Sequence, residues 1–185
     1  MALNSSATAE EIEIRIKTVE HLFNGLDPAP FRERELDREA ERHIISYARE
    51  VAAGRPINLV IYLQGATIEP ALTKELEAAI RRHFEHQAKD RETELSELRR
   101  LGRKGLAIGL LVMLFATLSG VALINAFPES RFIETIEQSL IIFGWVALWR
   151  PIEILLYDRW PLIRARKLFQ RLATAPVIVR AATET

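Results

Sequence analysis

Cysteine is absent from this chain of 185 residues, and its absence removes several kinds of chemistry at once. Without thiols there are no disulfides, no thiolate metal ligands and no cysteine nucleophile. Histidine is scarce as well, and only His83 and His86 stand close together, three positions apart on an expected helix. A metal site needs three or four converging ligands. We therefore expect these two histidines to lie on a solvated helix face, with neither a metal nor another cofactor.

Other functional signatures are missing too. Gly65, after an expected strand, is followed by no further glycine or lysine that would form a phosphate-binding loop. No candidate nucleophile in the sequence has a suitably placed general base. The basic residues gather beside the expected membrane segments, at the level of the lipid headgroups, and the remainder of the chain is acidic, so we expect no nucleic acid as a partner. The first residues carry neither a basic region nor an apolar stretch, so we expect no cleavable signal peptide. These patterns favour a protein that is not an enzyme.

One long apolar run is present, from Leu106 to Phe127, and it contains no charged side chain. About twenty such residues allow an α-helix to cross the hydrocarbon core of a bilayer. A second run, from Ser139 to Trp149, is too short alone but reaches spanning length when it is extended from Ile133 to Leu156. We therefore expect a transmembrane helical hairpin over residues 99–159.

Basic residues gather beside both runs, on the sides away from the connecting loop. Arg99, Arg100, Arg103 and Lys104 precede the first run, and Arg159, Arg164, Arg166 and Lys167 follow the second. The loop region carries one basic residue, Arg131, against Glu129, Glu134 and Glu137. Because positive residues favour the cytoplasmic side of a membrane, both termini are expected in the cytoplasm.

Upstream of the first run, the pattern becomes that of a small α/β domain. Charged and β-branched residues alternate from Glu11 to Lys17, which predicts a strand with one buried face. Asp37 is a suitable N-cap for a helix whose apolar residues recur at helical spacing up to Val51. The apolar stretch Ile57–Leu63 then predicts a buried strand and completes a βαβ unit.

Further elements are expected on either side of the hairpin. From Pro70 a helical pattern meets no breaker before Gly102, so a long stem helix should run into the first span. Trp160 and Pro161 are expected to begin an interfacial amphipathic helix. The tail from Ala175 to Arg180 predicts a strand that is unstable alone and should join the N-terminal sheet.

The expected fold class is thus an α/β membrane protein in three parts. Residues 1–98 form a cytoplasmic α/β domain with the stem helix, residues 99–159 form the hairpin, and residues 160–185 form the amphipathic helix and the returning strand.

Arg150 and Glu153 are the sharpest polar feature, because ionisable groups at membrane depth are costly. They stand three apart and can pair on one helix face. Pro151 deprives the carbonyl of Ala147 of its backbone donor, so a kink is expected here. Three interpretations stay open. The pair locks the helix near the membrane boundary, where arginine reaches water; it lines an ion or proton path; or it binds a lipid headgroup or a protein partner.

Small residues recur at four-residue spacing on the first span. Gly105 and Gly109 form one such pair, and Ala116 and Gly120 form another. Small residues at this spacing let helices approach closely in lipid. We expect them to pack against the second span around Gly144, or against another copy of the chain.

A loop rich in turn formers precedes Asp37, and its residues Asp27, Pro28, Pro30 and Phe31 are candidates for contact with a partner. The motif LFNxLDPxPFxxRxLD over residues 22–37, with GWVALWRPIEI over 144–154 and YDxWP over 157–161, resembles a group of uncharacterised bacterial two-span membrane proteins. The resemblance implies the bacterial cytoplasmic (inner) membrane as the location. It brings no activity, cofactor or assigned site.

These patterns predict a membrane-anchored adaptor or scaffold that presents a cytoplasmic α/β domain to a protein partner and forms an oligomer with itself or with that partner. The alternative is a small homo-oligomeric ion or proton channel, or a transporter, that uses Arg150 and Glu153. Two spans cannot enclose a pore, so this alternative requires several copies around an axis.

Overall fold

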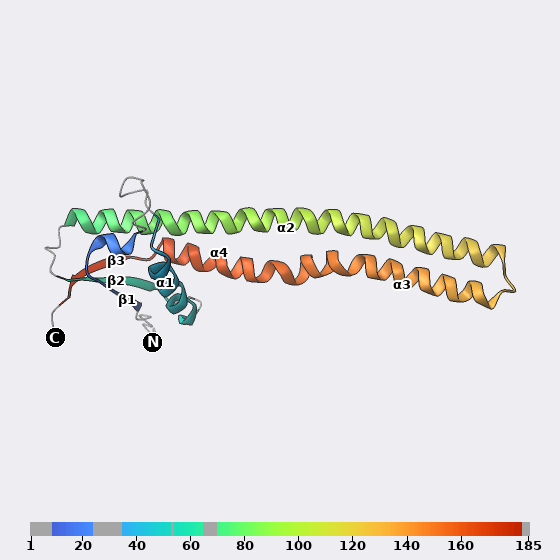
Figure 1. Ribbon diagram of the computed structural model, residues 1–185, viewed down its shortest axis with the longest axis horizontal. Coiled ribbons are helices and arrows are strands. Elements are labelled where there is room, and N and C mark those ends of the chain that lie inside the picture. The colour runs from blue at the N-terminus through green and yellow to red at the C-terminus, as the bar shows by residue number, and fades with distance from the viewer. Residues whose placement is uncertain (1–8, 24–34, 53, 65–69, 183–185) are drawn as a thin grey trace, which may run out of the picture. The chain divides into compact units, whose positions relative to one another are not determined.

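The computed structural model describes residues 9–23, 35–52, 54–64 and 70–182 (Figure 1). Its elements follow in the order β1 (Glu10–Ile16), the 3-10 helix η1 (Val19–Leu22), α1 (Arg38–Glu50), β2 (Ile57–Leu63), α2 (Pro70–Ala126), α3 (Arg131–Glu153), the π-helical turn η3 (Ile154–Asp158), α4 (Arg159–Ala173) and β3 (Val177–Ala181). The chain is mostly helical and divides into two compact units. The α/β unit comprises Met1–Asp90 and Ala165–Thr185, and the helical unit comprises Arg91–Arg164.

Three parallel strands form the sheet of the α/β unit, in the order β1-β2-β3 (Figure 1). The register pairs Glu10 with Ile57 and Ile16 with Leu63, and it pairs Leu59 with Val177 and Leu63 with Ala181. The expectation that the C-terminal strand returns to the N-terminal sheet is therefore confirmed. The expected βαβ unit is met in part, because the connection from β1 to β2 also holds η1 and an isolated antiparallel bridge between Phe23 and Leu36.

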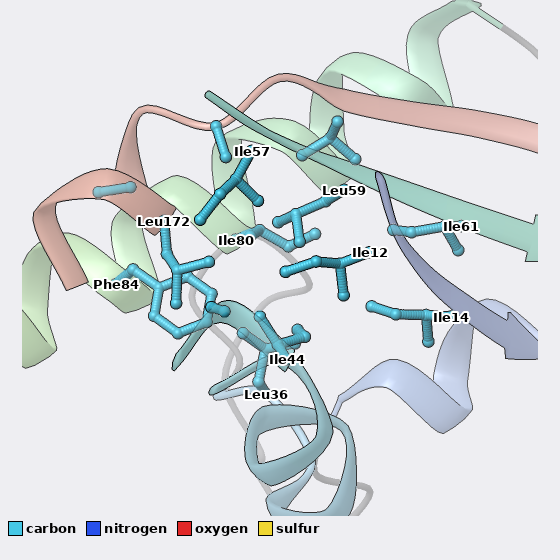
Figure 2. Close-up of a cluster of buried hydrophobic side chains, with 14 of the residues drawn as sticks. Ile12, Ile14, Leu36, Ile44, Ile57, Leu59, Ile61, Ile80, Phe84 and Leu172 are labelled. Atoms are coloured by element: carbon cyan, nitrogen blue, oxygen red, sulfur yellow. The ribbon is translucent and has the colours of Figure 1, made fainter. Parts of the chain in front are cut away.

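One face of this sheet carries the hydrophobic core (Figure 2). Alternate side chains of a strand point to the same face, and this places Ile12 and Ile14 of β1 beside Leu59 and Ile61 of β2. The helices add Ile44 from α1, Ile80 and Phe84 from α2, and Phe169 and Leu172 from α4. The rings of Phe84 and Phe169 stack with their centroids 6.2 Å apart. The core is thus closed by residues from both ends of the chain.

Local signals account for the start of α1. Asp37 has non-helical backbone angles, and its carboxylate accepts hydrogen bonds from the backbone N–H groups of Glu39 at 2.8 Å and Ala40 at 3.3 Å. These two donors would otherwise lack a partner at the end of the helix. The predicted N-cap is confirmed.

The expected stem helix is present, since α2 runs from Pro70 to Ala126 without interruption. Helix α4 begins at Arg159, close to the start expected at Trp160 and Pro161, but no break precedes it, because helical backbone continues from α3 through η3 into α4. Pro161 falls in the first turn of α4, where proline is tolerated. The π-helical turn before it contains Tyr157, whose carbonyl Pro161 cannot bond, and such turns often accompany a break in the regular hydrogen-bond ladder.

Candidate functional site

Glycines on α2 and α3 determine how closely the two helices of the helical unit approach. A Cβ added at Gly109 would lie 2.9 Å from the carbonyl oxygen of Ala147, and one added at Gly144 would lie 3.0 Å from the Cα of Met113. Gly105 faces Pro151, Gly120 faces Glu137, and Ala116 is buried. From Gly105 to Gly120 the residue numbers on α2 increase, while those of their partners on α3 decrease from Pro151 to Glu137. The two helices are therefore antiparallel. Of the two uses expected for these small residues, the structure shows packing within the hairpin.

The same contacts show which residues lie at one level of the hairpin. Gly105 is opposite Pro151 and Gly109 is opposite Ala147, so Arg150 is level with the first turn of the apolar run on α2. Of the basic residues that precede this run, Arg103 and Lys104 lie within about one turn of that level, and Arg99 and Arg100 lie within about two turns. Arg150 is therefore close to one end of the apolar segment and far from its centre.

Pro151 lies in the interface between the two helices, opposite Gly105. Because proline has no N–H, the carbonyl of Ala147 lacks its usual α-helical donor. That carbonyl oxygen is directed at Gly109, and the Cγ of Pro151 would be 3.1 Å from a Cβ at Gly105. The Cα–H of Gly109 can act as a weak donor to the oxygen. The two glycines thus accommodate both the proline ring and the carbonyl that lacks its usual donor.

Arg150 bridges two carboxylates of its own chain. Its Nη1 donates to Glu153 Oε2 at 3.0 Å, and its Nη2 lies 3.5 Å from Asp158 Oδ2. Asp158 stands eight residues further along, a rise of about 12 Å in a regular α-helix, and η3 lies between the two. Sequence reasoning paired Arg150 with Glu153 only. It missed Asp158 because a π-helical turn has no sequence signature that would have brought that residue within reach.

This network is on the surface of the helical unit. The side chain of Arg150 is 67% exposed, and those of Glu153 and Asp158 are 43% and 33% exposed. Exposed ion pairs in water contribute little to stability. The arrangement neutralises the arginine and leaves one net negative charge on the three side chains together.

Large apolar side chains cover the outward surface of the same unit. They include Leu110, Leu111, Leu114, Phe115 and Leu118 on α2, Phe132, Ile142, Phe143, Trp145, Val146 and Trp149 on α3, and Tyr157 and Trp160 beyond it. By length and composition, α2 and the helical run Arg131–Ala173 are each able to cross a membrane. Three of these side chains, Trp149, Tyr157 and Trp160, lie close in sequence to Arg150.

His83 departs from the expected solvated helix face. Its side chain is only 9% exposed, and Nε2 lies 3.5 Å from Glu41 Oε1 of α1 without a hydrogen-bond partner among the described residues. Burial lowers the pKa of His83, and the nearby carboxylates of Glu41 and Glu35 act against this shift. A sequence signal was present, because His83 follows the buried Ile80 by three residues and so belongs to the apolar stripe of α2.

His86, in contrast, is exposed and lies 3.7 Å from Asp90. The two histidines therefore do not converge on one site. Within residues 9–23, 35–52, 54–64 and 70–182, no group of three or more histidine, aspartate or glutamate side chains is placed to hold a metal ion.

The sheet face opposite the core is mostly polar, apart from the paired Val60 and Ile178, and interactions between strands cross it. Glu11 lies 3.6 Å from Arg180, the Tyr62 hydroxyl donates to Glu13 at 3.4 Å, and the Arg15 guanidinium lies 5.7 Å from the centroid of the Tyr62 ring. These contacts connect all three strands. Such a face is typical of a sheet that packs its other face on the hydrophobic core. The candidate partner loop, Asp27, Pro28, Pro30 and Phe31, lies outside the described residues.

Comparisons with protein-family models, with curated proteins and with solved structures give no match for this chain. The resemblance to bacterial two-span membrane proteins stays a prediction from the sequence motifs.

Proposed function

We propose that the protein is a membrane-anchored adaptor, in which α2 and α3 cross the bacterial inner membrane as a hairpin and the α/β unit is presented to a protein partner in the cytoplasm. One observation supports this proposal most strongly. The helical unit exposes large apolar side chains such as Phe115 at 74% and Trp149 at 73%, whereas the α/β unit has a closed core and a polar outer face.

Burial separates this interpretation from that of a soluble helical protein. The core helix of a soluble protein also passes a test of length and composition, but it is mostly buried. Here only 17% of the apolar window of each long helix is buried within the chain. Soluble monomers rarely expose so many large apolar side chains together. Lipid solvates such side chains, and a helix in lipid satisfies its backbone hydrogen bonds internally.

Cysteine labelling tests insertion and orientation, because the natural chain has no cysteine that would give a background signal. In intact cells, Ser130→Cys in the connecting loop should react with a membrane-impermeant maleimide. Thr174→Cys, after α4, should react only once the cells are opened. Extraction of the protein by alkaline carbonate would contradict insertion, and the reverse labelling pattern would contradict the proposed orientation.

The channel alternative depends on Arg150 and Glu153, and two features of the hairpin weigh against it. The small residues that would support close helix association are used between α2 and α3 of one chain. Arg150 also has its counter-charges on its own helical run, near one end of the apolar segment. A polar path through an oligomer requires such groups along the centre of the span.

Native mass spectrometry in nanodiscs distinguishes the two functions. A monomer or a defined complex with another protein supports the adaptor. A ring-sized homo-oligomer whose ion flux disappears in Glu153→Gln would replace the adaptor by the channel. Thermal unfolding of Glu153→Gln that matches that of the natural chain would exclude loss of folding as the cause.

The loop at residues 27–31 provides a separate test of partner binding. A variant with Pro30→Ala and Phe31→Ala should recover less of a co-purifying protein while its thermal unfolding is unchanged. Equal recovery from the natural chain and the variant would reject this loop as the contact surface.

A further inference from the structure

Helix α1 carries a stripe of arginines on a side that does not enter the core. At about 100° per residue, Arg38, Arg42 and Arg49 fall within about 40° of one another around the helix axis. Ile44 and Ala48, which are completely buried, lie on a different side of the helix. All three arginines are exposed.

An open groove of about 470 Å³ follows this stripe. Its described lining consists of Arg38, Glu41, Arg42, Ile45, Ser46 and Arg49. A volume of this size falls within the range of small-molecule sites in proteins. This lining contains three guanidinium groups and one carboxylate, so the groove carries a net positive charge.

The arginines of the groove are not paired with any carboxylate in the described part of the chain. Arg55, Arg81 and Arg91 each have a carboxylate within 3.2 Å. Arg38, Arg42 and Arg49 make no ion pair or side-chain hydrogen bond to any described residue. The one carboxylate of the groove, Glu41, lies 3.5 Å from His83 of α2.

Arg38 and Arg42 are one helical turn apart, and like charges at this spacing destabilise a helix slightly. An anion between the two guanidinium groups would remove the repulsion. The planar fork of arginine binds phosphate oxygens in pairs, which makes it the side chain best suited to this role.

We propose that the α1 groove binds a phosphate-bearing molecule. Arg38 and Arg42 hold one phosphate group, and Arg49, about 10 Å further along the axis, reaches a second anionic group of the same ligand. The Ser46 hydroxyl donates a further hydrogen bond, and Ile45 provides an apolar contact. The occupant is a soluble phosphorylated metabolite or the headgroup of an anionic phospholipid, which present the same phosphate oxygens. The site is independent of the proposed adaptor function.

The test uses the full chain in a neutral detergent at low salt, with one probe for each source. Inorganic pyrophosphate, titrated by calorimetry, represents the soluble ligand, and short-chain phosphatidylglycerol, followed by native mass spectrometry, represents the headgroup. Combining Arg42→Gln with Arg49→Gln should weaken binding at least about tenfold, since charge-assisted hydrogen bonds are lost. Arg42→Lys should weaken binding less. The control, Arg81→Gln, removes one positive charge from an arginine that pairs with Glu77 and should leave binding unchanged.

Each outcome decides the proposal. Pyrophosphate binding that is lost in the double variant assigns a soluble phosphate compound, and phosphatidylglycerol binding that is lost in it assigns the headgroup. If neither probe binds the natural chain, or if the double variant binds as tightly as the natural chain, the groove is an ordinary solvated helix face. An equal loss in Arg81→Gln would also overturn the site, because it would show that only net charge matters. Matched thermal unfolding of all variants ensures that folding is not the cause.

Discussion

Replacing Gly109 with alanine should destabilise the helical unit even though alanine is the better helix former. Helix propensity alone favours alanine over glycine by about 1 kcal/mol. The new Cβ would, however, lie 2.9 Å from the carbonyl oxygen of Ala147 and 2.9 Å from Leu148 Cδ2, whereas ordinary contact begins at 3.4 Å. A backbone carbonyl cannot rotate away, so the helices must separate by about 0.5 Å, and overpacking of this kind costs about 1–3 kcal/mol. We expect a net loss of about 1 kcal/mol.

Gly102→Ala is the matched comparison on the same helix. There the atom nearest to the new Cβ is Leu155 Cδ2 at 2.7 Å, at the end of a flexible side chain that can change its rotamer. This variant should lose less than Gly109→Ala. The three tryptophans, Trp145, Trp149 and Trp160, all belong to the helical unit. Tryptophan fluorescence during unfolding by dodecyl sulfate in mild detergent therefore reports on this unit.

Two outcomes would contradict this account of Gly109. If Gly109→Ala is as stable as the natural chain or more stable, the close approach to Ala147 does not constrain the helices. If Gly102→Ala and Gly109→Ala lose the same amount, the difference between a backbone neighbour and a side-chain neighbour has no effect.

Three further predictions concern the α/β unit, with unfolding by urea in detergent followed by circular dichroism. Asp37→Ala removes the acceptor of two backbone N–H groups and should cost about 1 kcal/mol, most of which Asp37→Asn should restore. Leu172→Ala, at a completely buried position, should cost about 2–5 kcal/mol, whereas the exposed Gln170→Ala should cost less than about 0.5 kcal/mol. Burial lowers the pKa of His83 from its ordinary 6.5, so the unfolded chain binds this proton more tightly. The free energy of unfolding should therefore lose nothing to His83 above pH 6.5 and should decrease as the pH drops below it. His83→Gln should make this pH dependence less steep, and the exposed His86→Gln should not.

The elements that sequence reasoning found are those with a local cause. The alternation from Glu11 to Lys17 requires only that one face of a strand be buried, and the structure places Ile12 and Ile14 in the core and leaves the residues between them exposed. Asp37 caps α1 through atoms two and three residues away. Such features depend on short-range geometry and can be predicted without knowledge of the fold.

The features that sequence reasoning missed depend on distant residues. The apolar stripe of α2 held a local signal for the burial of His83, but its neighbour Glu41 comes from α1, 42 positions away, and no local pattern contains that contact. Asp158 meets Arg150 through a turn whose hydrogen-bond register differs from that of an α-helix. The spacing of Gly105 and Gly109 predicted close packing but left its partner open, because any small-residue stripe fits several neighbours. Only the structure identifies α3.

The strand order also makes the sheet depend on the last part of the chain. β2 is the central strand, and its second partner, β3, follows both long helices in the sequence. Until β3 is synthesised, one edge of β2 lacks its ladder and the core lacks Val177. Pairing of strands so far apart is slow, because a long loop must close before the contact forms. In the membrane interpretation, the hairpin is therefore inserted before the α/β unit is complete.

Truncation after Ala175 tests this dependence, because it removes β3 and also the carbonyl of Pro176 that accepts from the N–H of Leu59. The shortened chain should unfold in its helical unit as the natural chain does, by tryptophan fluorescence, since α2 and α3 keep all their mutual contacts. Its β1, α1 and β2 segments should be cleaved by protease at least about tenfold faster, because the open fraction of the domain rises when strand pairing is lost. Equal protease resistance of the two chains would mean that β1 and β2 with their helices are stable alone, and that β3 adds an edge without completing the fold.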